Sequence, residues 1–312
     1  MRHDKVKSRL GNYIRRVAES NYYLARTHYT FLQGRKQQRY DKPPILIFQM
    51  GKVGSSTIVS SFKVLNLDRP VYHSHILTWP RIKETESQRK KLFLTERYSH
   101  LKRPWLNQFI RGQIDKGFKN RKWKIISLMR EPISRNISTF FENLQVDIIK
   151  ENEAYQIASE YYGFGPLTVK MDNLNELVDI YFKCFRHDTP LTFFDVEFKG
   201  VLKFDVFEHP FQPLKGYAIY PGENFDVMLI RLENLNSVAE TAFAEFLDLK
   251  SFRLVSSNIG QEKIYAPLYK KFKQEVVFPK RYLDRFYHSR FMKHFYSEAE
   301  IKRMRSTWKC KD

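Results

Sequence analysis

Short apolar runs alternate along the chain with segments of helical periodicity. Residues 45–48 form a continuous run, ILIF, which is typical of a strand buried on both faces of a sheet. The runs at 124–129 and 227–230 have the same character, and a further strand is predicted at 70–73. Elsewhere apolar residues recur at helical spacing, as in the stretch 58–65. This alternation predicts an α/β fold with a parallel sheet covered by helices on both faces.

Prolines and capping signals indicate where helices should begin. Pro132 follows a predicted strand and suits the first turn of a helix, where a proline loses no hydrogen bond. Ser237 with Glu240 has the spacing of a capping box, and so does Ser297 with Glu300. Each pair therefore predicts the start of a helix.

We expect an appended arm followed by one domain. Residues 1–42 are basic and follow helical spacing only loosely, so they are predicted to form a helical arm that ends at the double proline 43–44; an ordinary N-terminal helix packed on the domain is the alternative. Residues 43–312 contain no internal repeat and no linker strong enough to divide them. They are predicted to form a single α/β domain.

Composition excludes several classes of protein. Of the 312 residues 42% are hydrophobic and 15% aromatic, which is enough for a large core and rules out a disordered chain. The two cysteines, Cys184 and Cys310, lie in no CxxC or Cys/His cluster, so a disulfide scaffold and a Cys-rich zinc fold are excluded. No stretch reaches 18 apolar residues without charges, and no apolar signal sequence is visible. A cytoplasmic location is expected, with peripheral membrane contact at most.

The formal net charge of +20 is unevenly distributed. Residues 1–44 carry 11 basic and 3 acidic side chains, whereas residues 131–262 carry 11 basic and 21 acidic ones. Such a field suits an anionic partner: a nucleotide, an acidic saccharide, an anionic membrane or a nucleic acid. The basic arm is the segment that would contact a membrane. The basic, aromatic stretch 258–308 is more typical of helices with basic stems on a core than of nucleic-acid stacking.

The first predicted strand runs directly into a loop of glycines and hydroxyl residues, GKVGSST. Backbone N–H groups at the start of a helix, together with a lysine and hydroxyls, form an anion site. In a Walker A loop the lysine follows the second glycine, but here Lys52 precedes Gly54, which disfavours an ATPase or kinase. The candidate phosphate-binding residues of this loop are Lys52, Val53, Gly54, Ser55, Ser56 and Thr57.

A second motif, LMREPISRNIS, follows the strand at 124–129. Arg130 stands at the end of that strand, and Ser138 lies two turns into the following helix. An arginine offers a fork of donors for a phosphate, and a serine adds a hydroxyl. Two anion sites at neighbouring strand ends indicate a nucleotide phosphorylated at two places, so we expect Lys52 and Arg130 to lie close together.

These two motifs resemble those of sulfotransferases that use 3′-phosphoadenosine 5′-phosphosulfate (PAPS). Within that family the chain looks like the bacterial group of capsular polysaccharide synthesis proteins, with a motif match over roughly residues 45–250. The resemblance assigns the 5′-phosphosulfate to the loop, through Lys52, Gly54, Ser55 and Ser56. It assigns the 3′-phosphate to Arg130-Glu131-Pro132, Arg135 and Ser138.

The resemblance implies a P-loop-like, three-layer fold with about five parallel strands. It also implies transfer of a sulfuryl group from PAPS to a hydroxyl of a glycan acceptor, with 3′,5′-adenosine bisphosphate as the product. Lys52 is then the candidate that stabilises charge on the leaving oxygen, and no metal is needed. Family members carry a C-terminal Arg-Lys-Gly turn over the donor; this triplet is absent, and Lys263 with Tyr265 is the expected replacement.

The proton acceptor for the acceptor hydroxyl has four candidates. His73 and His75 both lie at the end of a predicted strand beside the first one, and a histidine titrates near neutral pH. Of the two, His75 is narrowly favoured. Asp195 and Glu197 are the carboxylate alternatives, although an ion-paired or solvated role suits each of them better. A zinc site on the two histidines would need a third ligand, for which the sequence offers no clear candidate.

Two other functions remain open from the residues alone. A kinase with a degenerate phosphate loop would bind ATP with magnesium more tightly than the bisphosphate. A basic nucleic-acid-binding protein would bind RNA or DNA with a steep dependence on salt. The placement of both motifs at strand ends disfavours the latter, so no nucleic-acid partner is expected.

Overall fold

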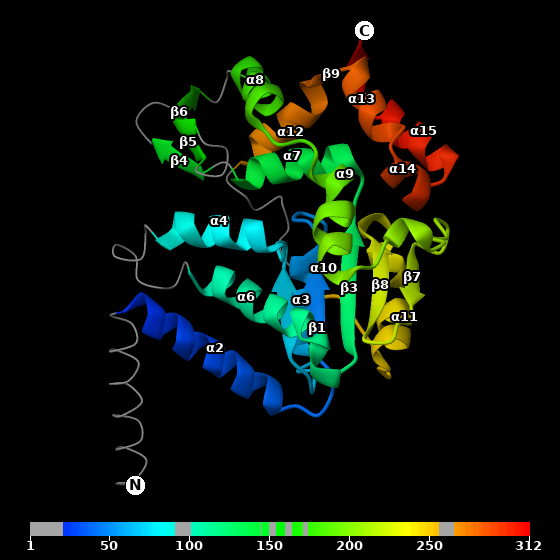
Figure 1. The fold of residues 1–312 in the computed structure, drawn as a ribbon. Coiled ribbons are helices and arrows are strands. Elements are labelled where there is room, and N and C mark those ends of the chain that lie inside the picture. The colour runs from blue at the N-terminus through cyan, green and yellow to red at the C-terminus, as the bar shows by residue number, and fades with distance from the viewer. Residues whose placement is uncertain are drawn as a thin grey trace.

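The computed structural model describes residues 21–90, 101–143, 145–149, 154–159, 164–170, 174–255 and 265–312. The principal elements, drawn in Figure 1, are α2 (Tyr22–Gln38), β1 (Ile45–Phe48), α3 (Ser55–Val64), β2 (Val71–Ser74), α4 (Trp79–Lys90), α6 (Lys102–Asp115), β3 (Trp123–Met129), α7 (Pro132–Asn143), β4 (Gln145–Ile149), β5 (Ala154–Ser159), β6 (Phe164–Lys170), α8 (Leu174–Cys184), α9 (Thr189–Phe193), α10 (Gly200–Leu202), β7 (Tyr217–Tyr220), β8 (Phe225–Arg231), α11 (Leu235–Leu247), α12 (Ala266–Glu275), β9 (Val277–Pro279), α13 (Lys280–Tyr287), α14 (Arg290–Phe295), α15 (Glu298–Ser306) and β10 (Lys309–Lys311). Short turns of 3-10 helix and one π-helical segment, η3 (Phe194–Lys199), connect them.

The core of the fold is a five-stranded sheet in the order β2-β1-β3-β8-β7. Strands β2, β1, β3 and β8 are parallel, and β7 runs antiparallel to β8 at the edge. The α/β class is therefore confirmed, whereas the fifth strand differs from the expected parallel arrangement. The reason is the short connection at 221–224, which can join antiparallel neighbours but is far too short for a parallel crossover.

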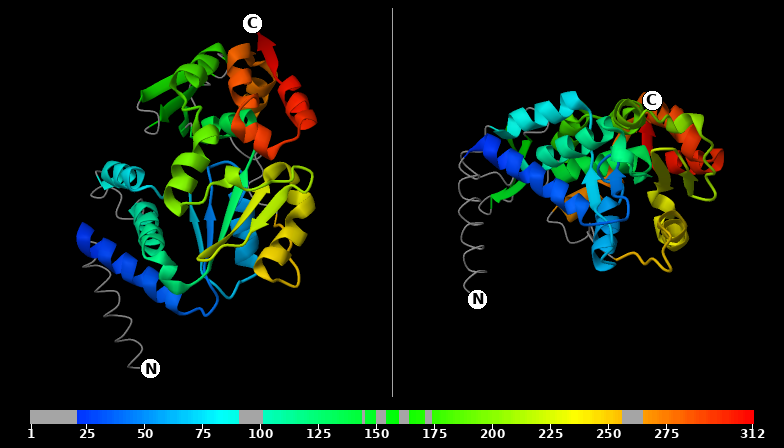
Figure 2. Two further views of the ribbon diagram at one scale, coloured as in Figure 1. Left: turned by 45° about the vertical axis from the view of Figure 1, so that its right-hand side comes forward. Right: turned by 60° about the horizontal axis from the view of Figure 1, so that its bottom comes forward.

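Helices cover both faces of this sheet, as Figure 2 shows. On one face α3 packs against α11 through Phe62 and Phe243, whose ring centroids are 5.5 Å apart. On the other face, Tyr72 of β2 meets Phe109 of α6 at 6.0 Å, and Phe48 of β1 stacks on the η3 segment. Phe48 and the other residues of β1 are fully buried, as the continuous apolar run predicts.

The C-terminal helices are tied to the carboxyl end of the sheet by buried polar contacts. The hydroxyl of Tyr287 donates to Glu131 Oε1 at 2.8 Å and accepts from the Trp308 ring nitrogen at 2.8 Å. Arg231, at the end of β8, is 1% exposed and pairs with Glu300 at 2.5 Å. The segment after residue 265 therefore closes over the sheet edge where both motifs lie.

Two of the predicted boundaries need correction. β2 runs one residue later than the predicted 70–73. The helix expected to start at Ser237 begins at Leu235, because it continues directly from a turn of 3-10 helix; its N-cap is Asn234, and the Ser237 hydroxyl bonds to the Asn234 carbonyl. The prediction of a capping box at Ser237 and Glu240 is therefore wrong.

The second capping prediction is confirmed, and one sheet was not predicted. The capping box at Ser297 and Glu300 is present at the start of α15. Helix α2 occupies residues 22–38 of the predicted arm. Residues 1–20 of the arm lie outside the described part of the chain. The antiparallel sheet β4-β5-β6 was not predicted. Within the described residues no helix is both long and apolar enough to cross a membrane.

Gly54 is the one position of the first loop where a side chain is excluded twice. Its φ of 95° is unfavourable for an L-residue, and an added Cβ would lie 2.6 Å from Cδ1 of Leu232. We therefore expect Gly54→Ala to lower the free energy of unfolding by about 1–3 kcal/mol, measured by urea denaturation. Gly112→Ala is the matched control: it is helical with nothing within 4 Å of the new methyl, and should be neutral or stabilising. Equal stability of the two variants would contradict this account of Gly54.

Candidate active site

The loop between β1 and α3 leaves a row of backbone donors without protein partners. Lys52 and Gly54 have positive φ angles of 66° and 95°, which turn successive peptide N–H groups toward one side. Among the described residues, none of the N–H groups from 51 to 56 has a hydrogen-bond partner. Since these donors also include the first turn of α3, the loop has the geometry of an anion site.

Two arginines from the second motif hold the opposite side of this loop. Arg130 Nη1 donates to the Lys52 carbonyl at 3.1 Å, and Arg135 Nε donates to the Gly51 carbonyl at 3.1 Å. The structure therefore brings Lys52 and Arg130 together at the carboxyl ends of the neighbouring strands β1 and β3. Arg130 is half-buried, whereas Arg135 is only 4% exposed, so Arg135 supports the loop from behind.

The Lys52 ammonium group already has a counter-ion. Its Nζ lies 3.2 Å from Glu142 Oε2, and the hydroxyl of Tyr265 donates to the same oxygen at 2.6 Å. Burial and the neighbouring Glu142 carboxylate raise the pKa of Tyr265, so the phenol remains a donor. An anion that binds at the loop has to compete with Glu142 for Lys52.

A third cation, Lys273 of α12, lies near Arg130. Burial lowers the pKa of Lys273, and the nearby Arg130 charge lowers it further, which places the two cations within electrostatic range. The Lys273 ammonium is 5.7 Å from the Trp308 ring centroid and 5.8 Å from that of Tyr269. Together Lys52, Arg130 and Lys273 form a basic cluster at the carboxyl end of β1 and β3.

The hydroxyl residues of the two motifs occupy different depths. Ser55 is buried in the first turn of α3, Ser56 is exposed, and Thr57 and Ser138 are half-buried. The Ser138 side chain lies on α7, one turn beyond Arg135, and has no hydrogen bond to a described residue. Val53 is fully buried and anchors the loop in the core. Lys263 lies outside the described residues.

The two candidate histidines are neighbours at the end of β2. Their ring centroids are 4.6 Å apart, and His75 Nδ1 is 2.8 Å from the carbonyl oxygen of Gln49. A carbonyl only accepts, so Nδ1 carries the proton and Nε2 has a free lone pair. Burial, with Arg103 and Arg135 nearby, lowers the pKa of His75 to about 4; burial, His75 and Arg103 lower that of His73 to about 3. Both rings are therefore neutral at pH 7, and burial keeps either from titrating near neutral pH, contrary to the expectation from the sequence.

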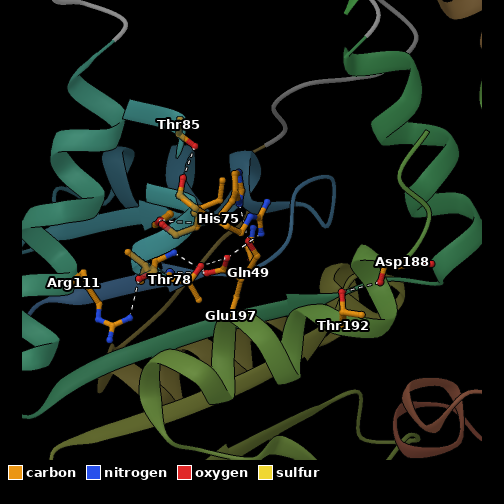
Figure 3. A network of polar contacts seen from close by, with 12 residues as sticks. Gln49, His75, Thr78, Thr85, Arg111, Asp188, Thr192 and Glu197 are labelled. Atoms are coloured by element: carbon orange, nitrogen blue, oxygen red, sulfur yellow. Dashed lines mark hydrogen bonds and ion pairs between the residues drawn. The ribbon is translucent and has the colours of Figure 1, made fainter. Parts of the chain in front are cut away.

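Gln49, at the end of β1, was not singled out from the sequence. Its side chain is 0% exposed, and neither polar atom of the amide has a partner among the described residues. Figure 3 shows it beside His75. Because a buried amide normally forms hydrogen bonds, an unpartnered one next to the loop and His75 is suited to a polar group of a ligand or to water.

The carboxylate candidates are engaged in structural contacts. Glu197 is 1% exposed and accepts hydrogen bonds from Leu77 N, Thr78 N, Thr78 Oγ1 and Arg81 Nη1, as Figure 3 shows in part. Asp195 is paired with Arg290 at 2.6 Å. Both carboxylates are therefore engaged in ion pairs with arginines. Within the described part of the chain no three His, Cys, Asp or Glu residues gather as metal ligands.

The fold and the site together define an α/β protein with a candidate anion site in the loop after its first strand and basic side chains around it. A family model described as "Putative capsular polysaccharide synthesis protein" (NKWYS) matches residues 166–297, from β6 to the start of the last helix. The chain is similar to this family over that stretch, which contains β8, α11 and α12 with Lys273 but neither anion motif. No curated protein and no solved structure matches the chain.

The buried histidines predict a loss of stability at mildly acidic pH. Between pH 6.5 and 4 the unfolded chain binds protons at His73 and His75 that the folded chain does not, so the free energy of unfolding falls as the pH is lowered. We expect His73→Asn to reduce the pH slope by up to about 1.4 kcal/mol per pH unit. Urea unfolding at several pH values in this range measures it. Leu214→Asn replaces an exposed residue with a group that does not titrate and should leave the slope unchanged, whereas equal slopes for wild type and His73→Asn would contradict the prediction.

Proposed function

We propose that this protein transfers a sulfuryl group from PAPS to a hydroxyl of a carbohydrate. The observation that carries the proposal is the meeting of two anion-binding elements at one sheet edge, where Arg130 of the second motif donates to Lys52 of the first. A donor molecule with phosphates at both its 3′ and 5′ positions needs two such elements. Similarity to a capsular polysaccharide synthesis family supports a glycan as the acceptor.

The residues present fit a nucleotide that carries anionic groups at two positions. The unpartnered N–H groups of the loop and the Lys52 ammonium suit the 5′-phosphosulfate, because both supply positive potential without a metal. Arg130 with Lys273 suits the 3′-phosphate, and the free hydroxyl of Ser138 adds a donor on α7. Lys273, on α12, adds a cation that the sequence analysis did not single out, while the role expected for Lys263 stays a prediction.

The reaction breaks one bond to sulfur and forms another. The acceptor oxygen bonds to the sulfur, the S–O bond to the 5′-phosphate breaks, and the bisphosphate leaves with the bonding pair. Lys52 and the loop N–H groups stabilise the negative charge that develops on the leaving oxygen. The hydroxyl proton passes to Nε2 of His75, whose orientation is fixed by the bond from Nδ1–H to the Gln49 carbonyl.

Binding of 3′,5′-adenosine bisphosphate tests the donor site directly. We expect the bisphosphate to raise the melting temperature of the wild type, and Lys52→Ala to weaken its binding at least tenfold, because a charged hydrogen bond contributes about 1.5–3 kcal/mol. Lys63→Ala is the control, since it removes an exposed lysine from α3, the helix that follows the loop of Lys52. Transfer of radiolabelled sulfate to a panel of glycans and lipid-linked saccharides should fall 100-fold or more in Lys52→Ala.

Three results would contradict the proposal. Indifference of the protein to the bisphosphate would exclude the donor site. Stronger stabilisation by ATP with magnesium would favour a kinase with a degenerate loop. Tight binding of RNA or DNA that falls steeply with salt and does not depend on Lys52 would favour a nucleic-acid-binding protein.

The contact between Glu142 and Lys52 makes a further prediction about the same site. Glu142→Gln removes the carboxylate that competes with the nucleotide for Lys52, so we expect the bisphosphate to bind several-fold more tightly. Isothermal titration calorimetry measures the change. Glu240→Gln alters the net charge equally on the exposed side of α11 and should have little effect. If the two variants bind alike, Glu142 has no influence on Lys52 beyond net charge.

A further inference from the structure

One helix exposes an apolar face that no described part of the protein covers. On α2, Tyr23, Leu24, Phe31 and Leu32 are 66%, 50%, 59% and 46% exposed. We call these four residues the α2 outer face. In Figure 1, α2 lies at the margin of the molecule, with α6 on its inner side. Large apolar side chains exposed to this extent and gathered on one element usually mark a contact surface.

The inner side of α2 already has its packing partners. Ala25 is buried against Leu101 and Trp105 of the α6 region, and the Tyr29 ring lies 5.8 Å from that of Trp105. At 100° per residue, the four outer residues span about half of the helix circumference; Leu24 and Phe31 lie in the middle of this span, roughly 100–160° from Ala25 and Tyr29, and Leu32 borders the Ala25 side. The outer face is therefore a second apolar stripe that folding of the described chain leaves in water.

No comparable group of exposed apolar side chains occurs elsewhere in the described chain. The other large apolar residues with high exposure lie at separate places, and they are Val64 with Leu65, Val196, Leu214 and Val277. Single exposed residues are normal for a soluble surface. The concentration of aromatic and leucine side chains on α2 is what distinguishes this face.

The rim of the α2 outer face is cationic. Residues 22–38 contain no acidic side chain. The guanidinium of Arg35 lies 5.8 Å from the ring centroid of Phe31, and Lys36 and Arg39 are exposed beside it. At the other end of the helix, Lys90 of α4 stands 5.3 Å from the Tyr23 ring centroid. Apolar residues bordered by cations match a layer whose apolar part lies beneath a plane of negative charge.

We propose that the α2 outer face docks on the surface of an anionic lipid bilayer, with α2 parallel to the membrane plane. Tyr23, Leu24, Phe31 and Leu32 enter the headgroup layer, while Arg35 and Arg39 meet lipid phosphates. Exposed aromatic rings suit this depth, because their apolar bodies and polar edges match the interface. The proposal rests on α2 alone and holds whether or not the protein transfers sulfate.

The test is flotation of the full chain with vesicles of phosphatidylcholine alone or with one quarter phosphatidylglycerol. We expect at least tenfold stronger binding to the anionic vesicles, weakened by salt. Phe31→Asp and Leu24→Asp should each reduce binding to anionic vesicles tenfold or more. Leu214→Asp is the matched control: it places the same charge on a more exposed leucine away from α2 and should bind as the wild type does.

Several outcomes would overturn the proposal. Equal flotation with both vesicle types, or flotation that survives in Phe31→Asp and Leu24→Asp, would show that α2 is not the docking element. Release of a dimer to monomer by Phe31→Asp, seen by light scattering without vesicles, would show that a second copy covers the face. Since Phe31 and Leu24 are exposed, both variants should keep the wild-type melting temperature, which separates a docking defect from misfolding.

Discussion

The hydrogen bonds from Arg130 and Arg135 to the carbonyls of Lys52 and Gly51 hold the loop after β1 in place at the carboxyl end of the central strands. Each guanidinium takes up a carbonyl on one side of the loop, so the N–H groups are presented on the other side. Charged donors also polarise the peptide groups they contact, which strengthens the positive potential of the exposed N–H groups. The positive φ angles of Lys52 and Gly54 are sustained by these contacts and by the close approach of Leu232.

The three residues Arg130-Glu131-Pro132 each satisfy a different structural demand. Arg130 holds the loop after β1, and Pro132 occupies the first turn of α7. Glu131 accepts from the N–H groups of Ile133 and Ser134 and also from the Tyr287 hydroxyl. The motif therefore couples the anion loop, the start of α7 and the C-terminal helices. A change at Glu131 would disturb the start of α7 and its tie to the C-terminal helices, so this short sequence is under structural as well as chemical constraint.

Local patterns predicted those parts of the structure that depend on neighbours in sequence. The run 45–48 became β1, and the turn after β3 placed Arg130 beside Lys52, because parallel strand ends share one edge. Contacts between distant segments were not predictable in this way. Glu142 contacts Lys52 from the far end of α7, and the charge of Arg130 acts on Lys273 of α12. Gln49 is a single polar residue after an apolar strand, and no spacing rule identifies its unpartnered amide.

Which of the basic side chains can interact with another molecule depends on which of them are already paired with carboxylates. Glu197 is neutralised by Arg81, and Asp226 by both Lys122 and Lys124. In those pairs the cation serves the fold. At Lys52 the partner Glu142 is itself partly exposed. If an anion displaced it, the Glu142 carboxylate would be hydrated by water, so breaking this ion pair would leave no buried unpaired charge. Ion pairs with a buried carboxylate thus belong to the scaffold, whereas the Lys52–Glu142 pair and the cations along α2 remain in contact with solvent, which is the condition for the anionic partners proposed above.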